Sequence, residues 1–237
     1  MSFWGNRGFN PIDLKLDRIV CSTSVSYLKK HPCFDKAKKG ECIDSAHRVV
    51  NDIVKKEALE EIKRSVSKNP LIIPVIDREG LSSNKLPIMY GLYIADQLQG
   101  EFVKNLVKTT KLANTNANLV QRVDNDIRFE GQFDMKDREI IIVDDTWTVG
   151  GTAMALVDHV LAQGGIVKAI TTLACGRYSK RISPEPSQLE SLAALLDLTV
   201  WELKNNYKHA IEQATGSEIQ ACILRGKGAG EMLKHAN

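Results

Sequence analysis

The stretch that decides the fold is Arg138 to Thr152, which reads R-E-I-I-I-V-D-D-T-W-T-V-G-G-T. Ile140 to Val143 are four consecutive β-branched residues without polar alternation, a pattern typical of a strand buried on both faces of a parallel sheet. Asp144 and Asp145 follow, and a glycine turn leads into 153–163, whose apolar residues recur at helical spacing. This order places polar groups at the carboxyl end of a strand, where open α/β sheets bind their ligands.

The glycine turn is suited to an anion. Backbone N–H groups of residues 148–152 can turn inward at a helix N-terminus, where the peptide dipole favours negative charge. Thr148 and Thr152 add hydroxyl donors, and Gly150 and Gly151 let a phosphate approach the backbone closely. The neighbouring carboxylates can accept hydrogen bonds from sugar hydroxyls or hold Mg²⁺ through water, so the predicted ligand is a phosphorylated sugar. The nucleoside-triphosphate loop G-x-x-x-x-G-K-[ST] is absent.

The segment V-D-D-T-W-T-V-G-G-T resembles the phosphoribosyl-pyrophosphate loop of type I phosphoribosyltransferases. That loop is typically an apolar strand, two acids, two apolar residues and T-T-G-G-T/S. The resemblance implies that Asp144 and Asp145 hold the ribose 2- and 3-hydroxyls, or Mg²⁺, and that Thr148 to Thr152 hold the 5-phosphate. The alternative is a plain sheet turn with two incidental acids.

Three positions depart from the family pattern. Thr146 and Trp147 replace the usual aliphatic pair, and Val149 replaces the second hydroxyl residue. Val149 removes one side-chain donor and keeps its backbone N–H. These departures favour an alternative in which the chain keeps the site as a sensor without turnover.

A second buried strand is predicted at Leu71 to Ile76, and D-R-E-G follows it. The resemblance implies that the loop after this strand binds pyrophosphate, with Arg78 and Gly80 as candidate ligands. Asp77 and Glu79 are unfavourable charges beside an anion, and the alternative for Arg78 is a solvated loop residue.

Two further loops are candidate parts of an active site. A strand at Val103 to Lys108 is predicted to lead into a long polar stretch reaching about Phe133, and a loop of this length inside a compact domain is usually functional or mobile. The resemblance, here to the ComF-like branch, implies a catalytic lid with Lys111 and Arg122 as candidate catalytic residues. A plain connector is the alternative.

The later chain predicts a strand at 166–174, followed by a basic loop in which Tyr178 could stack on a nucleobase. A basic surface loop without that role is equally compatible with the sequence. Helices are predicted from Pro184 or Pro186 to Leu196 and over 201–214. A last strand is predicted at 219–224, followed by a glycine-rich terminal turn.

The front of the chain predicts one helix over residues 44–67, capped by Asp44 or Ser45. Before and at its start lie four potential zinc ligands, with a lysine-rich tract between them. A surface loop with buried thiols is the favoured alternative to zinc, because the spacing matches no known motif. These four residues are His31, Cys33, Cys42 and His47.

Composition describes an ordinary globular protein: 43% hydrophobic, 26% charged, with a net charge of +3 that does not indicate nucleic-acid binding. No apolar run is long enough to span a membrane, and the first ten residues lack a signal-peptide pattern. The five cysteines form no C-x-x-C pair and no even framework, a usage that suits a reducing compartment and predicts a cytoplasmic protein.

The predicted fold is a three-layer α/β sandwich, with a mostly parallel sheet of about five strands and helices on both faces. Residues 1–69 are predicted to form a helical extension or hood, and residues 70–237 the α/β domain. The resemblance implies transfer of ribose 5-phosphate from phosphoribosyl pyrophosphate, with Mg²⁺, to or from a nucleobase, and a homodimer. The alternatives are a ribose-phosphate sensor, or a module with a protein partner, such as a ComF-type uptake factor or a bacterial defence effector.

Overall fold

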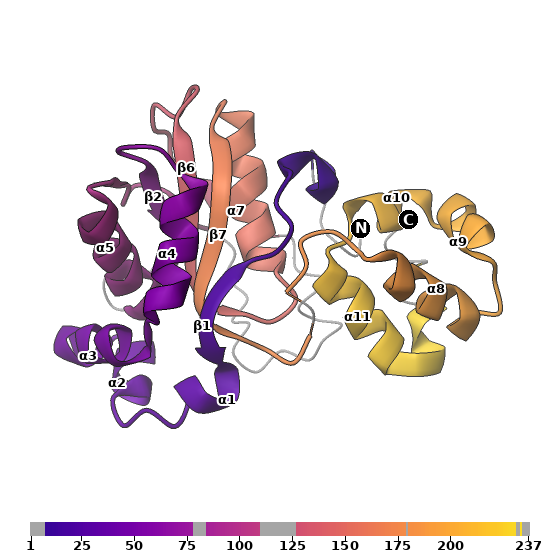
Figure 1. Ribbon diagram of the computed structural model, residues 1–237, viewed down its shortest axis with the longest axis horizontal. Helices are drawn as coiled ribbons and strands as arrows, with labels where there is room; N and C mark the ends of the chain where they lie inside the picture. The colour runs from indigo at the N-terminus through magenta and orange to yellow at the C-terminus, as the bar shows by residue number, and fades with distance from the viewer. Residues whose placement is uncertain (1–7, 78–83, 110–126, 179, 231–232, 234–237) are drawn as a thin grey trace.

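The structure of the protein is a computed structural model, which describes residues 8–77, 84–109, 127–178, 180–230 and 233. Its centre is a five-stranded sheet in which every pair of neighbouring strands is parallel (Figure 1). In spatial order the strands are β1 (Val20–Ser24), β7 (Ile166–Cys175), β6 (Glu139–Trp147), β2 (Leu71–Pro74) and β3 (Glu101–Phe102).

Helices lie on both sides of this sheet, as Figure 1 shows. On one side lie α3 (Ile43–Ile53), α4 (Lys56–Ser65) and α5 (Leu86–Leu98), with the short α1 (Val25–Leu28) and α2 (Phe34–Lys38) at one end. On the other side lies α7 (Gly151–Ala162). The predicted α/β sandwich with a parallel sheet of five strands and a helical N-terminal part is therefore confirmed.

The apolar run of β6 is buried on both faces, because successive side chains of a strand point to opposite sides. Ile141 and Val143 belong to the core shared with α3, α4 and α5, whereas Ile140 and Ile142 belong to the core shared with α7. All four side chains are fully buried. Burying each contributes about 1.5–3 kcal/mol, so this strand anchors both layers.

The C-terminal residues form a helical unit beside the sheet (Figure 1). It has an apolar cluster of its own, to which Leu192, Leu203 and Ile219 contribute. Its helices are α8 (Pro186–Leu195), α9 (Val200–Asn206), α10 (Lys208–Gln213), α11 (Gly216–Arg225) and the 3-10 turn η4 (Gly226–Gly228). The helix predicted over 201–214 is thus divided into two at Tyr207.

The strand predicted at 219–224 is wrong, because these residues belong to α11. A capping box begins this helix: the Glu218 N–H donates to Thr215 Oγ1 at 3.2 Å, and the Thr215 N–H donates to Glu218 Oε2 at 2.7 Å. A short apolar run does not distinguish strand from helix. The T-x-x-E signature before it was the stronger signal.

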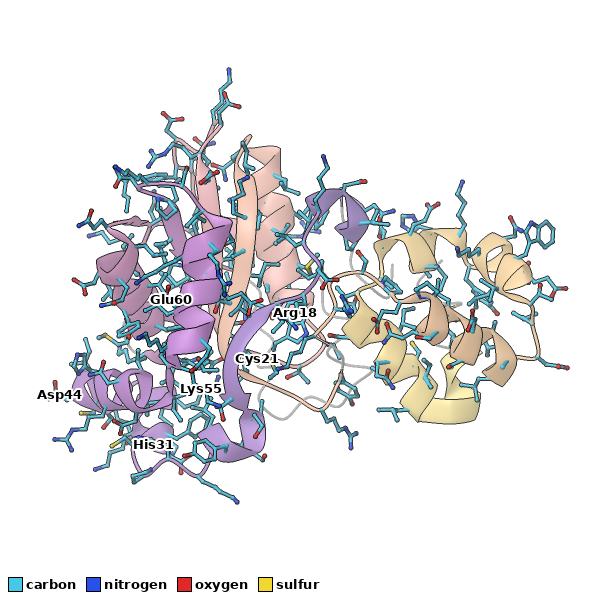
Figure 2. The ribbon with its side chains drawn as sticks, in the orientation of Figure 1. Arg18, Cys21, His31, Asp44, Lys55 and Glu60 are labelled. Carbon is cyan, nitrogen blue, oxygen red and sulfur yellow. A yellow bond between two sulfur atoms is a disulfide. The ribbon has the colours of Figure 1, made fainter. Side chains whose placement is uncertain are left out.

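The helix predicted over 44–67 is two helices, α3 and α4, separated at Val54, whose backbone is extended. The next residue, Lys55, donates its backbone N–H to Ser22 Oγ at 3.1 Å, which ties the break to β1 (Figure 2). The predicted cap is also wrong, because the N-cap of α3 is Cys42. Helical spacing continues across the break, so the sequence pattern conceals it.

The strand predicted at 103–108 is confirmed only at its end. Residues 103–106 are in no strand, and the sheet strand β3 ends before them, at Phe102. Val107–Lys108 form β4, which pairs with β5 (Phe129–Glu130) in a separate antiparallel ribbon. A short 3-10 helix, η1 (Pro11–Leu14), precedes β1. Although β1 lies within the predicted extension 1–69, it pairs with β7 as an edge of the main sheet. The division into two domains at residue 69 stays a prediction.

The cysteines depart from the prediction of unpaired thiols. Cys21 on β1 and Cys175 on β7 form a disulfide, with their Cα atoms 6.2 Å apart (Cys21 is labelled in Figure 2). Cys33 and Cys42 are half-buried, Cys222 is buried, and none of these three is in a disulfide. The bonded pair is separated by 154 residues, so only the pairing of the strands brings it together.

The described residues contain no group of three or more His, Cys, Asp or Glu side chains that could hold a metal ion. The ring of His31 has other partners: Nδ1 accepts from the Cys33 N–H at 3.1 Å, and Nε2 lies 3.0 Å from Asp52 Oδ2 (Figure 2). His47 contacts Asn51 on the same helix. These contacts give His31 and His47 partners within the protein, and the choice between the loop and a zinc site stays a prediction.

Among the described helices, none is long and apolar enough to cross a membrane.

Candidate functional site

Two adjacent carboxylates lie near the carboxyl end of β6, the central strand of the sheet. Asp144 is in register with Thr172 of β7, and the preceding Val143 is in register with Pro74 of β2. The Asp145 N–H donates to Asp144 Oδ1 at 2.7 Å, which couples the two acids. The sequence predicted the two acids directly after the strand, and the strand instead continues through them to Trp147.

Asp145 is 3% exposed, and three side chains contact its carboxylate. Lys38 Nζ, at the end of α2, forms an ion pair with Oδ2. Asn84 Nδ2 donates to the same oxygen at 2.9 Å, and Thr146 Oγ1 donates to Oδ1 at 3.2 Å. Asn84 Oδ1 also accepts the N–H of Leu86, the first residue of α5, at 3.1 Å, so one side chain contacts both the start of this helix and the acid.

These surroundings move the two carboxyl pKa values in opposite directions. Burial alone would raise the pKa of Asp145, but the charge and hydrogen bond of Lys38 outweigh burial and lower it. Burial, followed by the charge of Asp145, raises the pKa of Asp144 well above its ordinary value, against the opposing charges of Lys38 and Lys108. The pair therefore combines an ionised Asp145 with an Asp144 that tends to hold a proton.

A second ion pair lies at the end of the neighbouring strand β2. Lys108 Nζ is 2.7 Å from Asp77 Oδ1, and the Lys108 N–H donates to the carbonyl of Ile76 at 2.7 Å. The Lys108 side chain is 11% exposed and that of Asp77 is 42% exposed. Asp77, which the sequence analysis treated as an unfavourable charge beside an anion, is neutralised by this lysine.

The glycine turn has the geometry that its sequence predicts. Gly150 is the N-cap of α7 and has a φ of 91°, a left-handed conformation that a glycine adopts without steric cost. A Cβ at this position would also lie 2.4 Å from the indole ring of Trp147. Gly151 and Thr152 form the start of α7 and are half-buried. An N-terminus capped by glycine is compatible with an anion at the first turn of the helix.

The two apolar departures from the family pattern connect the turn to the C-terminal helices. The Trp147 side chain is 1% exposed, and its Nε1–H donates to Ser217 Oγ of α11 at 2.6 Å. The Val149 side chain lies in the apolar cluster of the helical unit, and its carbonyl accepts from Thr215 Oγ1 at 3.1 Å. Trp147 and Val149 therefore have a structural role in docking the helical unit.

The remaining predicted site residues are placed as follows. Tyr178 is half-buried against the helical unit, and the Arg177 guanidinium lies 5.3 Å from the centre of its ring. Its stacking on a base stays a prediction. Four candidates lie outside the described part of the chain: Arg78, Gly80, Lys111 and Arg122.

Three site residues were missed by the sequence analysis: Lys38, Asn84 and Lys108. Lys38 lies in a lysine-rich tract that reads as a solvated surface, and no local pattern distinguishes it from its neighbours. Asn84 lies one residue before Lys85, the N-cap of α5, in a polar segment that no spacing connects to β6. Their contacts join α2 and the segment before α5 to β6, and β4 to the end of β2, and only the tertiary fold creates those contacts.

A surface hollow of about 470 Å³ is lined by Gln132, Phe133, Asp134 and Gln163. Gln163 is the C-cap of α7, so this hollow lies at the opposite end of the helix from the glycine turn. The hollow is therefore separate from the acidic pair.

No protein-family model matches the sequence. Among curated proteins, the chain is 27% identical over 176 residues to the Escherichia coli protein TraN, which covers 74% of this chain and 39% of TraN. It is 31% identical over 134 residues to an uncharacterised protein of Haemophilus influenzae, which covers 56% of this chain and 30% of that protein. The chain thus spans less than two fifths of the length of these relatives.

Among solved structures, a hypoxanthine phosphoribosyltransferase of Staphylococcus aureus matches with a TM-score of 0.40 and 10% identity, over 59% of this chain and 69% of that chain. An adenine phosphoribosyltransferase of Leishmania tarentolae matches with a TM-score of 0.33 and 18% identity, over 62% and 76%. TM-scores this low assign neither a family nor an activity.

Proposed function

We propose that this protein is a phosphoribosyltransferase, which uses phosphoribosyl pyrophosphate and Mg²⁺ to transfer ribose 5-phosphate to or from a nucleobase. The observation that carries the proposal is the position of Asp144 and Asp145 on the central parallel strand, a few residues before the glycine N-cap of α7. Acceptors for sugar hydroxyls and a helix N-terminus suited to a phosphate are thereby adjacent.

Each part of the proposed site has a distinct task. The 148–152 turn binds the 5-phosphate, and the acidic pair orients the ribose hydroxyls, so that the C1 centre is held for displacement of pyrophosphate. The oxygen-only donor set of the pair fits Mg²⁺, which Asp144 and Asp145 would hold through water. Bound Mg²⁺ would supply charge neutralisation for the pyrophosphate.

The test is isothermal titration of phosphoribosyl pyrophosphate, with Mg²⁺, into the wild type and into Asp144→Asn/Asp145→Asn. We expect binding by the wild type and loss of binding by the double variant. Glu57→Gln/Glu190→Gln is the matched control, because it removes two negative charges from exposed positions on α4 and α8. Thermal unfolding of each variant shows whether the fold is retained. A folded wild type without binding would refute the proposal.

A second function is a ribose-phosphate sensor or a phosphoribosyltransferase-like module that acts with a protein partner. Two observations favour it: Trp147 and Val149 are committed to the helical unit, and Asp145 is already paired with Lys38. Turnover in a nucleobase screen would decide for the enzyme. Binding without turnover would decide for the sensor, and a partner copurifying at equal stoichiometry would decide for the module, of the ComF-type uptake or bacterial defence kind.

We further propose that the protein acts as a homodimer, without a membrane or nucleic-acid partner. The cytoplasmic location was predicted from cysteines without a disulfide framework, and the Cys21–Cys175 disulfide removes that support. A net charge of +3 in 237 residues is too small to indicate a nucleic-acid-binding surface. Light scattering on the purified protein measures the oligomeric state directly, and a monomer at micromolar concentration would contradict the dimer.

A further inference from the structure

Lys38 brings a positive charge into the site from outside the β6–α7 unit. It is the last residue of α2, a helix held against the core by the buried Phe34 and Ala37. Its side chain is 30% exposed, whereas that of Asp145, its partner, is 4% exposed. The lysine is therefore the member of the ion pair that reaches solvent and an incoming ligand.

The ion pair occupies the carboxylate of Asp145, which would otherwise accept hydrogen bonds from the hydroxyl groups of a ligand. Oδ2 of Asp145 contacts both Lys38 and Asn84, and Oδ1 accepts from Thr146. A carboxylate offers about four lone-pair sites, so an additional hydroxyl donor competes with these contacts. Displacing Lys38 from a buried partner is costly unless its charge acquires another anion.

The sheet order indicates where that anion would lie. Asp77, at the end of β2, also acts on Lys38 electrostatically, and β2 is the neighbour of β6 on the side opposite β7. Lys108, the partner of Asp77, acts on Asp144. Both lysines are thus associated with the edge between β6 and β2. A ligand anchored by one phosphate at the α7 turn and lying along the acidic pair would bring its other end to this edge.

We infer that Lys38 is an exchange residue: it neutralises Asp145 without ligand and, on binding, transfers its ion pair to a second anionic group of a sugar phosphate. The substrate class is a ribose phosphate that carries a diphosphate at its far end, and not a simple monophosphate. The inference rests on the proposed function and adds a selectivity residue to it.

The test compares phosphoribosyl pyrophosphate with ribose 5-phosphate, both with Mg²⁺, by isothermal titration into Lys38→Gln. Glutamine can still donate a hydrogen bond to Asp145 but carries no charge. We expect Lys38→Gln to weaken the binding of phosphoribosyl pyrophosphate by about tenfold or more, because one charged hydrogen bond to the ligand is lost. Ribose 5-phosphate, which has no second anion, is expected to bind equally well or more tightly, because Asp145 is no longer held by an ion pair.

Two matched variants complete the experiment. Lys36→Gln removes an exposed lysine of the same helix and is expected to leave both affinities unchanged, and Lys38→Arg, which keeps the charge, is expected to restore most of the diphosphate affinity. Thermal unfolding of each variant excludes loss of the fold as the cause. Inorganic pyrophosphate, titrated separately, is expected to show the same dependence on Lys38.

The outcomes are distinguishable. If Lys38→Gln weakens the binding of both ligands equally, the lysine only supports Asp145. If the affinity for phosphoribosyl pyrophosphate is unchanged, Lys38 does not contact the diphosphate. Either result overturns the inference and leaves the proposed function standing. A wild type that binds neither ligand overturns both. Selective loss of the diphosphate ligand supports both.

Discussion

The indole Nε1–H of Trp147 on β6 donates to Ser217 Oγ on α11 across 2.6 Å, and both side chains are buried. This bond joins the strand that carries the acidic pair to the C-terminal helical unit. The same indole ring lies against Gly150, where a Cβ would come within 2.4 Å of it. One side chain therefore both docks the helices and shapes the turn before α7.

We expect Trp147→Phe to destabilise the protein by about 2–4 kcal/mol, because it removes a buried hydrogen bond and leaves a cavity. Urea unfolding measures the loss, and hydrogen exchange locates it in α8–α11 and the 148–152 turn. Trp201→Phe is the matched control: Trp201 is 74% exposed on α9, so the same chemical change there is expected to cost little. Equal effects of the two substitutions would contradict the docking role.

Gly150→Ala is expected to lower stability by about 2–4 kcal/mol, because it adds a methyl group against the Trp147 ring to a backbone with a φ of 91°. Gly164→Ala separates the two causes. Its φ is 79°, and a Cβ there would meet its nearest neighbour, Lys136, at 3.6 Å, an ordinary contact, so only the backbone cost of about 1–2 kcal/mol applies. Thermal unfolding of both variants checks the difference. A Gly150 variant that unfolds no earlier than the Gly164 variant would show that the ring contact is not limiting.

Asp144→Asn and Asp145→Asn are expected to change stability in opposite directions at neutral pH. Asp144→Asn stabilises the unliganded protein, because burial and the charge of Asp145 raise the pKa of Asp144 and so disfavour, in the folded state, the ionised form that the unfolded chain has at this pH. Asp145→Asn destabilises it by about 2–4 kcal/mol, because Lys38 loses its ionised partner. Denaturant unfolding measures both values, and Asp96→Asn, at an exposed position of α5, is the control.

The same two acids predict opposite pH dependences. Asp145, whose folded pKa is lowered, contributes stability that is present above the unfolded value of about 3.9 and is lost as pH falls through the folded pKa. Asp144, whose folded pKa is raised, reduces stability as pH rises from the unfolded value to the folded one. Asp144→Asn should therefore flatten the stability profile above about pH 4, and a profile identical to that of the wild type would contradict the raised pKa.

The Cys21–Cys175 disulfide predicts which cysteines react with an alkylating reagent in protein purified without reductant. After unfolding, alkylation should label Cys33, Cys42 and Cys222, and mass spectrometry should find the peptides of Cys21 and Cys175 linked. Reduction should lower stability by about 2–5 kcal/mol, because the bond closes a long loop between two strands. A Cys222→Ala variant controls for loss of a buried thiol, and five alkylated cysteines would refute the pairing.

The sequence by itself determined the centre of the fold. The β-branched run of β6 is apolar on both faces, so it predicts a strand covered on both sides, and the residues after it predict the acidic pair and the helix that follows. These features are local, because strand periodicity, a glycine N-cap and helical spacing each depend on a few neighbouring residues. The errors also have local causes. The run 219–224 is too short to identify its structure without its cap, and α3 and α4 share a helical pattern across their break.

Only the tertiary structure decided what surrounds the acids. Lys38 and Asp145 are separated by 107 residues, and Trp147 and Ser217 by 70, so no spacing rule connects them. The fold brings α2 and β4 to the carboxyl ends of β6 and β2. It also packs the helical unit against the 148–152 turn, through Trp147 and Val149. Burial at that edge then moves the two carboxyl pKa values apart, because the cost of desolvation and the compensating charges depend on neighbours distant in the chain.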